Sequence, residues 1–159
     1  MAGTDIFFRD VEMVIASFTE ADVPRIQQML SELDQIATDL PKTAARCHSY
    51  RARLFSKLGQ HGDALAAINR AINLAPKDHS LLISRGRINA NGGRHAQAIA
   101  DFDRALAAEP DSAQALVHRG NTYKSMGDVA RARADYLAAL NLEPGSQPIK
   151  EKLKELGDA

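Results

Sequence analysis

The sequence predicts an all-α fold in which antiparallel pairs of helices are stacked one after another. The first observation behind this prediction is a repeated proline, because Pro76, Pro110 and Pro144 are each 34 residues apart. The second is the phrase that each proline ends, since AAINRAINLAP, ADFDRALAAEP and ADYLAALNLEP align without gaps. The third is a glycine-containing turn inside each interval, which divides it into two helix-sized halves. Together these indicate a regular helical repeat.

Helices are expected to begin and end at fixed places in each interval. Proline lacks a backbone N–H and disfavours helix in the residue before it, so each of the three prolines marks a helix end. Gly59, Gly93 and Gly127 lie where a helix end often needs a left-handed residue. Small residues let the two backbones of a pair approach, and we expect Gly120 to face the level of Ala132. Larger residues eight positions before each proline fill the remaining space: Ile68, Phe102 and Tyr136.

This pattern resembles the tetratricopeptide repeat, a helix-turn-helix unit of 34 residues. The resemblance covers residues 45–144 and implies a right-handed superhelical solenoid of antiparallel helix pairs. In the first helix of each unit the family has a large apolar, a small and an aromatic residue, which in the third repeat are Leu116, Gly120 and Tyr123. The second repeat departs from this order at Asn89, and the first repeat departs at His48.

The segments on either side of the repeats are expected to form helices that cap the stack. Residues 1–41 are predicted to be an N-terminal helical hairpin, with Phe7, Val11, Val14 and Phe18 on the apolar face of its first helix. Its second helix is expected to start after Asp22, a candidate N-cap. The assigned ranges are 45–78, 79–112 and 113–146 for the three repeats and 147–159 for a C-terminal capping helix.

Composition argues against several classes of protein. Lys and Arg number 20, as do Asp and Glu, so the formal net charge is zero and no global attraction to nucleic acid or anionic membranes is expected. The single Cys47 cannot form an internal disulfide, and residues 1–18 lack a basic leader followed by an apolar run. No stretch approaches the roughly 18 apolar residues of a membrane-spanning helix. We therefore expect a cytoplasmic protein that binds no nucleic acid and inserts into no membrane.

Charge is unevenly distributed although it sums to zero. Residues 1–41 carry two bases and eight acids, a net charge of −6, whereas residues 42–76 carry six bases and one acid, a net charge of +5. This asymmetry favours packing of the acidic N-terminal helices beside the basic first repeat. Arginine recurs at one register position, and aspartate recurs sixteen residues later in two repeats. The expected ion pairs are Arg85 with Asp101 and Arg119 with Asp135, although a ligand-binding role for the arginines, including Arg51, stays open.

Catalytic, metal and cofactor sites are not expected. No histidine has a second histidine four residues on, and His61 and His95 occupy equivalent turn positions in successive repeats, so they are copies of one another. Cys47 is interpreted as a packing residue, because its neighbour His48 points in a different direction on a helix. No glycine-rich segment has the spacing of a phosphate-binding loop. The sequence therefore predicts a non-enzymatic protein with no cofactor.

The resemblance also implies a binding site. In tetratricopeptide repeats the first helices of successive units line a concave groove that holds a peptide of a partner protein. The corresponding positions are Arg46, Ser49, Arg53, Ser56 and Lys57, then Ser80, Ile83, Arg87, Ala90 and Asn91, then Gln114, Val117, Asn121, Lys124 and Ser125. Five of the fifteen are basic and none is acidic, whereas an ordinary solvated face would show both signs. We therefore expect the groove to bind an acidic or carboxylate-bearing peptide, with Ile83 and Val117 forming a small apolar pocket.

Three other functions compete with peptide binding as explanations of these residues. One subclass of the family holds the acidic C-termini of heat-shock chaperones in a Lys/Asn/Arg clamp, whose places here hold Ser49, Arg53, Ser84, Gln114 and His118, so the clamp is not reproduced. A self-assembling scaffold or secretion-type chaperone is the alternative, forming a homo-oligomer through the apolar face of the N-terminal hairpin. A nucleic-acid reader of the pentatricopeptide type fits the register less well, and zero net charge disfavours phosphate binding.

Overall fold

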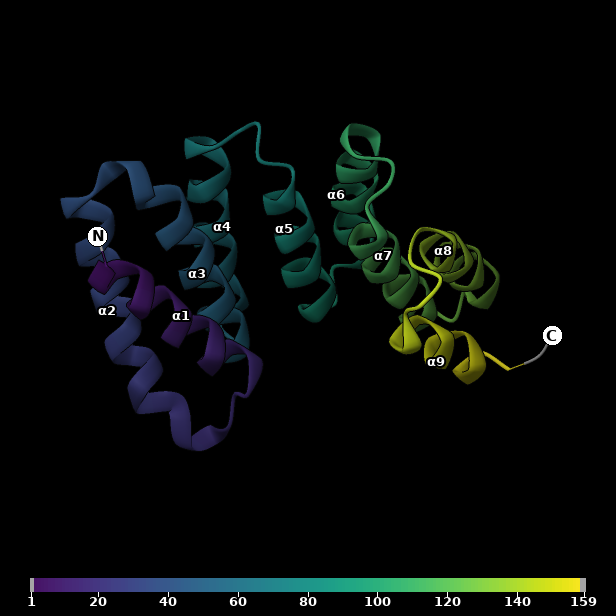
Figure 1. Ribbon diagram of the computed structural model, residues 1–159, viewed down its shortest axis with the longest axis horizontal. Coiled ribbons are helices and arrows are strands. Elements are labelled where there is room, and N and C mark those ends of the chain that lie inside the picture. Colours follow the sequence, from purple (N-terminus) through teal and green to yellow (C-terminus); the bar gives the residue numbers. More distant parts are fainter. Residues whose placement is uncertain (1, 158–159) are drawn as a thin grey trace. The chain divides into compact units, whose positions relative to one another are not determined.

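The protein is described by a computed structural model that covers residues 2–157 (Figure 1). These residues form nine α-helices and two short 3₁₀ helices and contain no strand, which confirms the all-α prediction. The helices are α1 Ala2–Ala16, α2 Val23–Asp39, α3 Ala44–Lys57, α4 His61–Leu74, α5 Ser80–Asn91, α6 His95–Ala108, α7 Ala113–Ser125, α8 Val129–Leu142 and α9 Gln147–Glu155. The chain divides into two compact units, Met1–Lys77 and Asp78–Ala159. None of the helices within residues 2–157 is both long enough and apolar enough to cross a membrane.

The first unit is built around one apolar cluster to which three helices contribute. Its buried members are Phe8, Val11, Val14 and Ile15 of α1, Ile26, Met29 and Leu33 of α2, and Cys47, Tyr50 and Leu54 of α3. The Phe8 ring stacks on Tyr50 with ring centroids 5.2 Å apart, and the Tyr50 hydroxyl donates a hydrogen bond to Glu12. Helices α1 and α2 therefore both pack on α3, and α4 completes the unit by packing against α3.

The buried face of α1 differs from the predicted one. Phe7 and Phe18 are only half-buried, while Phe8 and Ile15 join the two predicted valines in the core. The helix also ends at Ala16, so Phe18 lies outside it. Contact with α3 explains the difference, because it turns the Phe8 side of the helix inward. Val11 and Val14 of the predicted face are buried by the chain's own helices, whereas Ile6 and Met13 of α1 are 59% and 57% exposed, so self-assembly through this helix stays a prediction.

Charged contacts join the acidic N-terminal helices to the basic first repeat, as the charge distribution predicted. The Arg46 guanidinium lies 3.7 Å from the Asp5 carboxylate of α1, and Arg51 pairs with Asp34 of α2. Cys47 is fully buried beside these contacts, which agrees with its interpretation as a packing residue. Burial also raises the pKa of the Cys47 thiol, which makes the nucleophilic thiolate scarcer.

The ends of the helices follow the predicted punctuation, with one exception. Gly127 has a φ of 79°, the left-handed conformation that ends α7, and the equivalent glycines of the other two repeats also have positive φ. Asp128 then caps α8 by accepting a 2.9 Å hydrogen bond from the N–H of Arg131. The exception is Asp22, which does not cap α2 through its side chain. Its carboxylate accepts hydrogen bonds from the backbone N–H and hydroxyl of Thr19, and these bonds lower the pKa of Asp22.

In the second unit α5 packs against α6, α7 packs against α8, and α9 covers α8. Ala132, Tyr136 and Ala139 of α8 are fully buried in its core. Gly120 does not face the level of Ala132 as expected, because it lies against the Tyr136 ring, where an added Cβ would come within 2.7 Å of a ring carbon. The aromatic side chain occupies the space that the glycine leaves.

The predicted ion pairs of the second and third repeats are confirmed. Asp101, only 4% exposed, accepts hydrogen bonds from Arg85 at 3.0 Å to Nε and 2.5 Å to Nη2. Asp135 is 6% exposed and accepts hydrogen bonds from Arg119, one from Nε at 2.9 Å and one from Nη2 at 2.7 Å. Arg119 also donates through Nη1 to Asp103 at 2.5 Å. Because both oxygens of a buried carboxylate are engaged, these pairs fix each helix pair at a defined register.

Candidate functional site

The predicted groove residues of the first unit lie on α3. Exposed among them are Arg46 and Lys57, and half-buried are Ser49, Arg53 and Ser56. Two of the cations lie over aromatic rings, with the guanidinium carbon of Arg46 4.0 Å from the Phe8 centroid and that of Arg53 5.5 Å from the Tyr50 centroid. Since Arg46 also pairs with Asp5, helix α1 supplies this part of the surface with an acidic partner.

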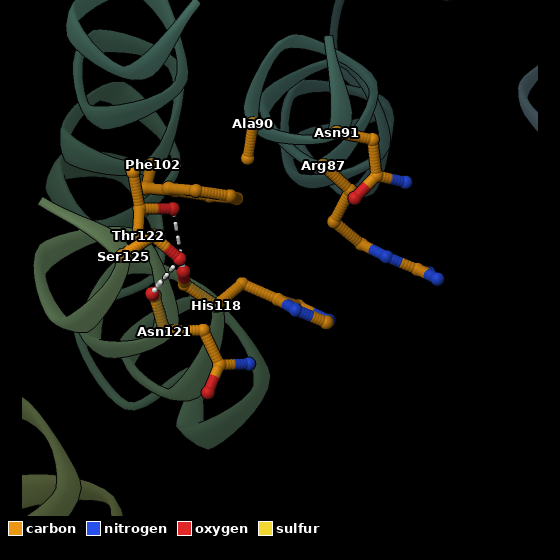
Figure 2. A pocket seen from close by; sticks show the side chains of 8 residues that line it. All are labelled: Arg87, Ala90, Asn91, Phe102, His118, Asn121, Thr122 and Ser125. Carbon is orange, nitrogen blue, oxygen red and sulfur yellow. Dashed lines mark hydrogen bonds between the residues drawn. The ribbon is translucent and has the colours of Figure 1, made fainter. Parts of the chain in front are cut away.

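In the second unit a pocket of about 290 Å³ opens between α5 and α7 (Figure 2). Its lining consists of Arg87, Ala90 and Asn91 from α5, Phe102 from α6, and His118, Asn121, Thr122 and Ser125 from α7. Figure 2 shows Arg87 and Asn91 extending from one helix and His118 and Asn121 from the facing one. None of the eight lining residues is acidic, and five of them are positions that the sequence assigned to the groove.

The other predicted residues of α5 and α7 do not line this pocket. Ile83 is buried, with 6% of its surface exposed, and Val117 is half-buried, so the expected small apolar pocket offers little surface to a ligand. Gln114 and Lys124 are exposed. The Lys124 ammonium donates a 2.6 Å hydrogen bond to Glu155 of α9 and lowers the pKa of that carboxyl. The acidic partners of the predicted cations thus come from the flanking helices.

His118 and Phe102 form the aromatic part of the pocket. Their rings stack with centroids 6.1 Å apart and planes inclined by 18°. Burial, aided by the positive charges of Arg87 and Lys152, lowers the pKa of His118 to about 4. The imidazole is therefore neutral at pH 7, and Arg87 is the cation of the lining.

Two side chains of α7 are held in place by hydrogen bonds. The Asn121 amide oxygen accepts a 2.7 Å bond from the Tyr136 hydroxyl, and the amide nitrogen lies on the His118 side of the pocket (Figure 2). The Ser125 hydroxyl donates a 3.0 Å hydrogen bond to the backbone carbonyl oxygen of Asn121. An amide whose oxygen is already bonded presents its N–H groups as donors, which suits an anionic or carbonyl ligand.

The low pKa of His118 predicts a pH dependence of stability. In the unfolded chain the imidazole titrates near 6.5, so as the pH falls from 6.5 to 4 the unfolded state takes up a proton that the folded state excludes. The contribution of the neutral His118 to the free energy of unfolding is fully present above pH 6.5. About 3 kcal/mol of it is lost by pH 4. Urea unfolding of wild type and His118→Phe, which keeps an aromatic ring, should show a stability difference that shifts in favour of the variant as the pH falls from 7.5 to 4.5.

The same substitution at His79, which precedes α5, provides the control for a general effect of removing a histidine. The His79→Phe variant measures the effect of removing a histidine that does not line the pocket. Parallel profiles for wild type and His118→Phe would show that His118 protonates as easily in the folded chain as in the unfolded one.

The repeat pattern and the helix pairs agree with the matches to sequence profiles of the tetratricopeptide repeat. Profiles of this family match residues 51–119 and residues 113–146. The chain belongs to the tetratricopeptide repeat family. Tetratricopeptide repeats are typically non-enzymatic protein-interaction modules, and their all-α helical solenoid is the fold class of this chain.

Solved tetratricopeptide repeat structures share the fold at low sequence identity. A repeat protein from Parabacteroides merdae is 21% identical with a TM-score of 0.79, and the match covers 97% of this chain and 57% of that one. The first repeat domain of Spaghetti (RPAP3), bound to the HSP90 peptide SRMEEVD, is 20% identical with a TM-score of 0.64 over 70% of this chain and 89% of that one. The second repeat domain of human RPAP3, in complex with the HSP70 peptide SGPTIEEVD, is 22% identical with a TM-score of 0.65. That match covers 75% of this chain and 99% of the RPAP3 domain. No curated protein matches the sequence.

Three residues of the pocket were not among the predicted tetratricopeptide repeat groove positions: Phe102, His118 and Thr122. Phe102 was assigned to the core by its place before Pro110, and its ring edge also reaches the pocket. His118 was considered only as a place in the chaperone clamp. Its signal was available, because it lies three residues before the predicted groove residue Asn121 and therefore on the same side of α7. Among the residues that the structure describes, no group of three or more His, Cys, Asp or Glu side chains could hold a metal ion.

Proposed function

We propose that this chain binds an acidic or carboxylate-bearing peptide segment of a partner protein at the pocket between α5 and α7. The lining carries the proposal: Arg87 supplies a positive charge, Asn91 and Asn121 supply amide donors, and none of the eight residues is acidic. Such donors bind carboxylate oxygens, and an arginine can do so through two parallel hydrogen bonds. A pocket with aromatic walls and a few convergent polar groups is the usual form of a specific binding site.

The titration of His118 supports the sign of the ligand. Burial is the main cause of the low pKa of this imidazole, and the positive charges of Arg87 and Lys152 lower it further, which supports an anionic ligand. A bound carboxylate would offset these positive charges, and the neutral His118 ring adds no charge of its own to the site. Peptide binding should therefore be salt-sensitive, because the Debye length is about 8 Å at physiological ionic strength.

The peptides bound by two structural neighbours have the proposed chemistry. SRMEEVD and SGPTIEEVD, bound by RPAP3 domains, each end in Glu-Glu-Val-Asp. We propose an acidic peptide as the ligand. Because the chaperone clamp is not reproduced here, we do not propose a chaperone as the source of that peptide. The predicted positions Ser49, Arg53 and Lys57 on α3 are proposed as peptide-binding residues of the first unit by itself. Arg46 and Lys124 would have to exchange Asp5 and Glu155 for the peptide. Residues 1–41 and 147–159 are proposed as the caps of the three repeats.

Reversing the charge of Arg87 tests the proposal. A fluorescein-labelled SRMEEVD peptide should bind the wild-type chain with a Kd near the micromolar range, about −8 kcal/mol. Arg87→Glu should weaken binding at least about tenfold, because it places a like charge beside the carboxylates. Fluorescence anisotropy measures both, and circular dichroism checks that the variant keeps its helices.

Arg104→Glu is the matched control. It makes the same charge change at an exposed position of α6 that does not line the pocket. The control should bind as the wild type does, and a peptide with Gln and Asn in place of its acidic residues and an amidated C-terminus should not bind. Equal affinities for Arg87→Glu and wild type, or no affinity of the wild type for the acidic peptide, would contradict the proposed function.

A further inference from the structure

A second pocket, of about 180 Å³, lies in the first unit and has no part in the proposed peptide site. Its lining is Arg51 and Phe55 of α3 and Asp63, Ala66, Ala67 and Arg70 of α4. The pocket occurs where the first repeat departs from the other two. In those repeats the equivalent place holds the aspartate of the buried ion pair, sixteen residues after the arginine.

The first repeat keeps the arginine but lacks the aspartate. Arg51 corresponds to Arg85 and Arg119, and sixteen residues later the first repeat has Ala67. The three second-helix positions are equally buried, with 5% of Ala67, 4% of Asp101 and 6% of Asp135 exposed. The first repeat therefore has an open volume beside the arginine where the other two repeats have a carboxylate.

The nitrogen atoms of Arg51 show which interaction is missing. Arg51 uses Nη1 to pair with Asp34 of the preceding helix, as Arg119 uses Nη1 to pair with Asp103. In Arg119 the opposite edge, Nε and Nη2, holds Asp135. In Arg51 the Nε is buried and has no hydrogen-bond partner among the residues that the structure describes. A buried donor without a partner is rare and costly, so this edge is prepared for an acceptor from outside the chain.

We propose that this pocket is an anion site that binds a carboxylate, whose oxygens take the place that Asp101 and Asp135 have in the other repeats. The carboxylate accepts hydrogen bonds from the Nε edge of Arg51, and Arg70 adds a second positive charge at the pocket. Arg119 shows that one guanidinium in this position can hold two carboxylates at once, so Asp34 does not prevent a second anion from binding.

The walls of the pocket favour a small monocarboxylate group over a phosphate. Phe55, Ala66 and Ala67 offer apolar surface to the carbon atoms next to the carboxyl, and the Arg51 guanidinium carbon lies 5.7 Å from the Phe55 centroid. Asp63 places a negative charge in the lining, which penalises a dianion more than a monoanion. Either a free short-chain acid or the side chain of a glutamate in a peptide presents this chemistry.

Proton-detected NMR of the Arg51 Nε–H group tests the site directly. Titration of the full chain with sodium propionate, against sodium chloride at the same ionic strength, should shift this signal downfield in a saturable way with a Kd of about 10 mM. The signal is assigned by its loss in Arg51→Lys. Methylphosphonate should bind at least about threefold more weakly. The peptide Ac-Ala-Ala-Glu-Ala-Ala-NH₂ distinguishes the source: tighter binding than propionate indicates a protein side chain, and weaker binding indicates a free acid. No saturable shift with either carboxylate would overturn the proposal.

Ala67→Asp supplies the missing carboxylate from within the chain and should abolish the propionate shift. Because it also gives the Arg51 Nε a partner, we expect its Tm to rise by about 3 °C. Ala100→Asp introduces the same charge at the exposed position of α6 that corresponds to Ala66, and it should leave the Tm and the propionate titration unchanged. An unaltered propionate shift in folded Ala67→Asp would overturn the assignment of the anion to this pocket. Arg87→Glu should still respond to propionate at Arg51, which separates this site from the peptide site.

Discussion

Replacing Phe102 with alanine is expected to lower the free energy of unfolding by about 4 kcal/mol. The side chain is fully buried, and its ring packs where an added Cβ at Gly86 would come within 2.6 Å. Its other side stacks on His118 in the peptide pocket. Truncation therefore leaves a cavity between α5, α6 and α7 that the stiff helix pairs cannot close. Chemical denaturation monitored by circular dichroism measures the loss.

Leu137→Ala in α8 is the control for this truncation. Leu137 is 47% exposed, so its replacement should cost less than about 0.5 kcal/mol. We also expect the folded fraction of Phe102→Ala to bind the acidic peptide more weakly, because the stacking partner of His118 is gone. Similar losses of stability for the two variants would show that Phe102 is not part of a tightly packed core.

Replacing Arg119 with methionine is expected to cost about 3 kcal/mol. The substitution leaves the buried Asp135 carboxylate without the two hydrogen bonds it receives at 2.9 Å and 2.7 Å. Breaking a buried pair by removing one partner is costly mainly because the other charge stays buried. The cost lies at the lower end of the usual range because 22% of the Arg119 side chain is exposed. Urea unfolding at pH 7 gives the value.

The double variant Arg119→Met with Asp135→Leu separates the charge from the packing. Removing both charges should recover most of the lost stability, since apolar replacement of a whole buried pair is often neutral. If the double variant is as unstable as the sum of the two single variants, the ion pair contributes through side-chain packing and not through the penalty of a lone buried charge.

Much of the fold could be predicted because it is set by local signals repeated three times. The prolines and the turn glycines fix the helix ends through backbone geometry, which needs no knowledge of distant contacts. The pairing of Arg85 with Asp101 could be predicted from their recurrence alone. The face of α1 could not, because both Phe7 and Phe8 fit a helical apolar stripe. Stacking of Phe8 on Tyr50 decides between them, and that contact joins residues far apart in the sequence.

Some of the groove positions predicted from the sequence lie together at the candidate pocket. Arg87 and Asn121 were assigned to the groove, and both line the pocket. The charge distribution predicted contacts between the N-terminal helices and the first repeat, but it did not indicate that Asp5 would engage the groove residue Arg46 or that Glu155 would engage Lys124, since such contacts depend on tertiary packing. Ile83 was expected to meet a ligand because the family pattern treats it as a surface position, yet it is buried here.

The central claim, that the pocket between α5 and α7 holds a carboxylate of the partner peptide, is tested most directly by the titration of His118. Its imidazole signals are followed by NMR as the pH is lowered, once with the free chain and once with saturating SRMEEVD peptide. The free chain should titrate near 4, since burial, Arg87 and Lys152 all lower this pKa. A carboxylate bound beside the ring should raise the pKa of His118 by about one unit or more, because a neighbouring negative charge favours the imidazolium. Peptide binding that leaves the titration of His118 unchanged would place the ligand elsewhere on the chain and contradict the claim.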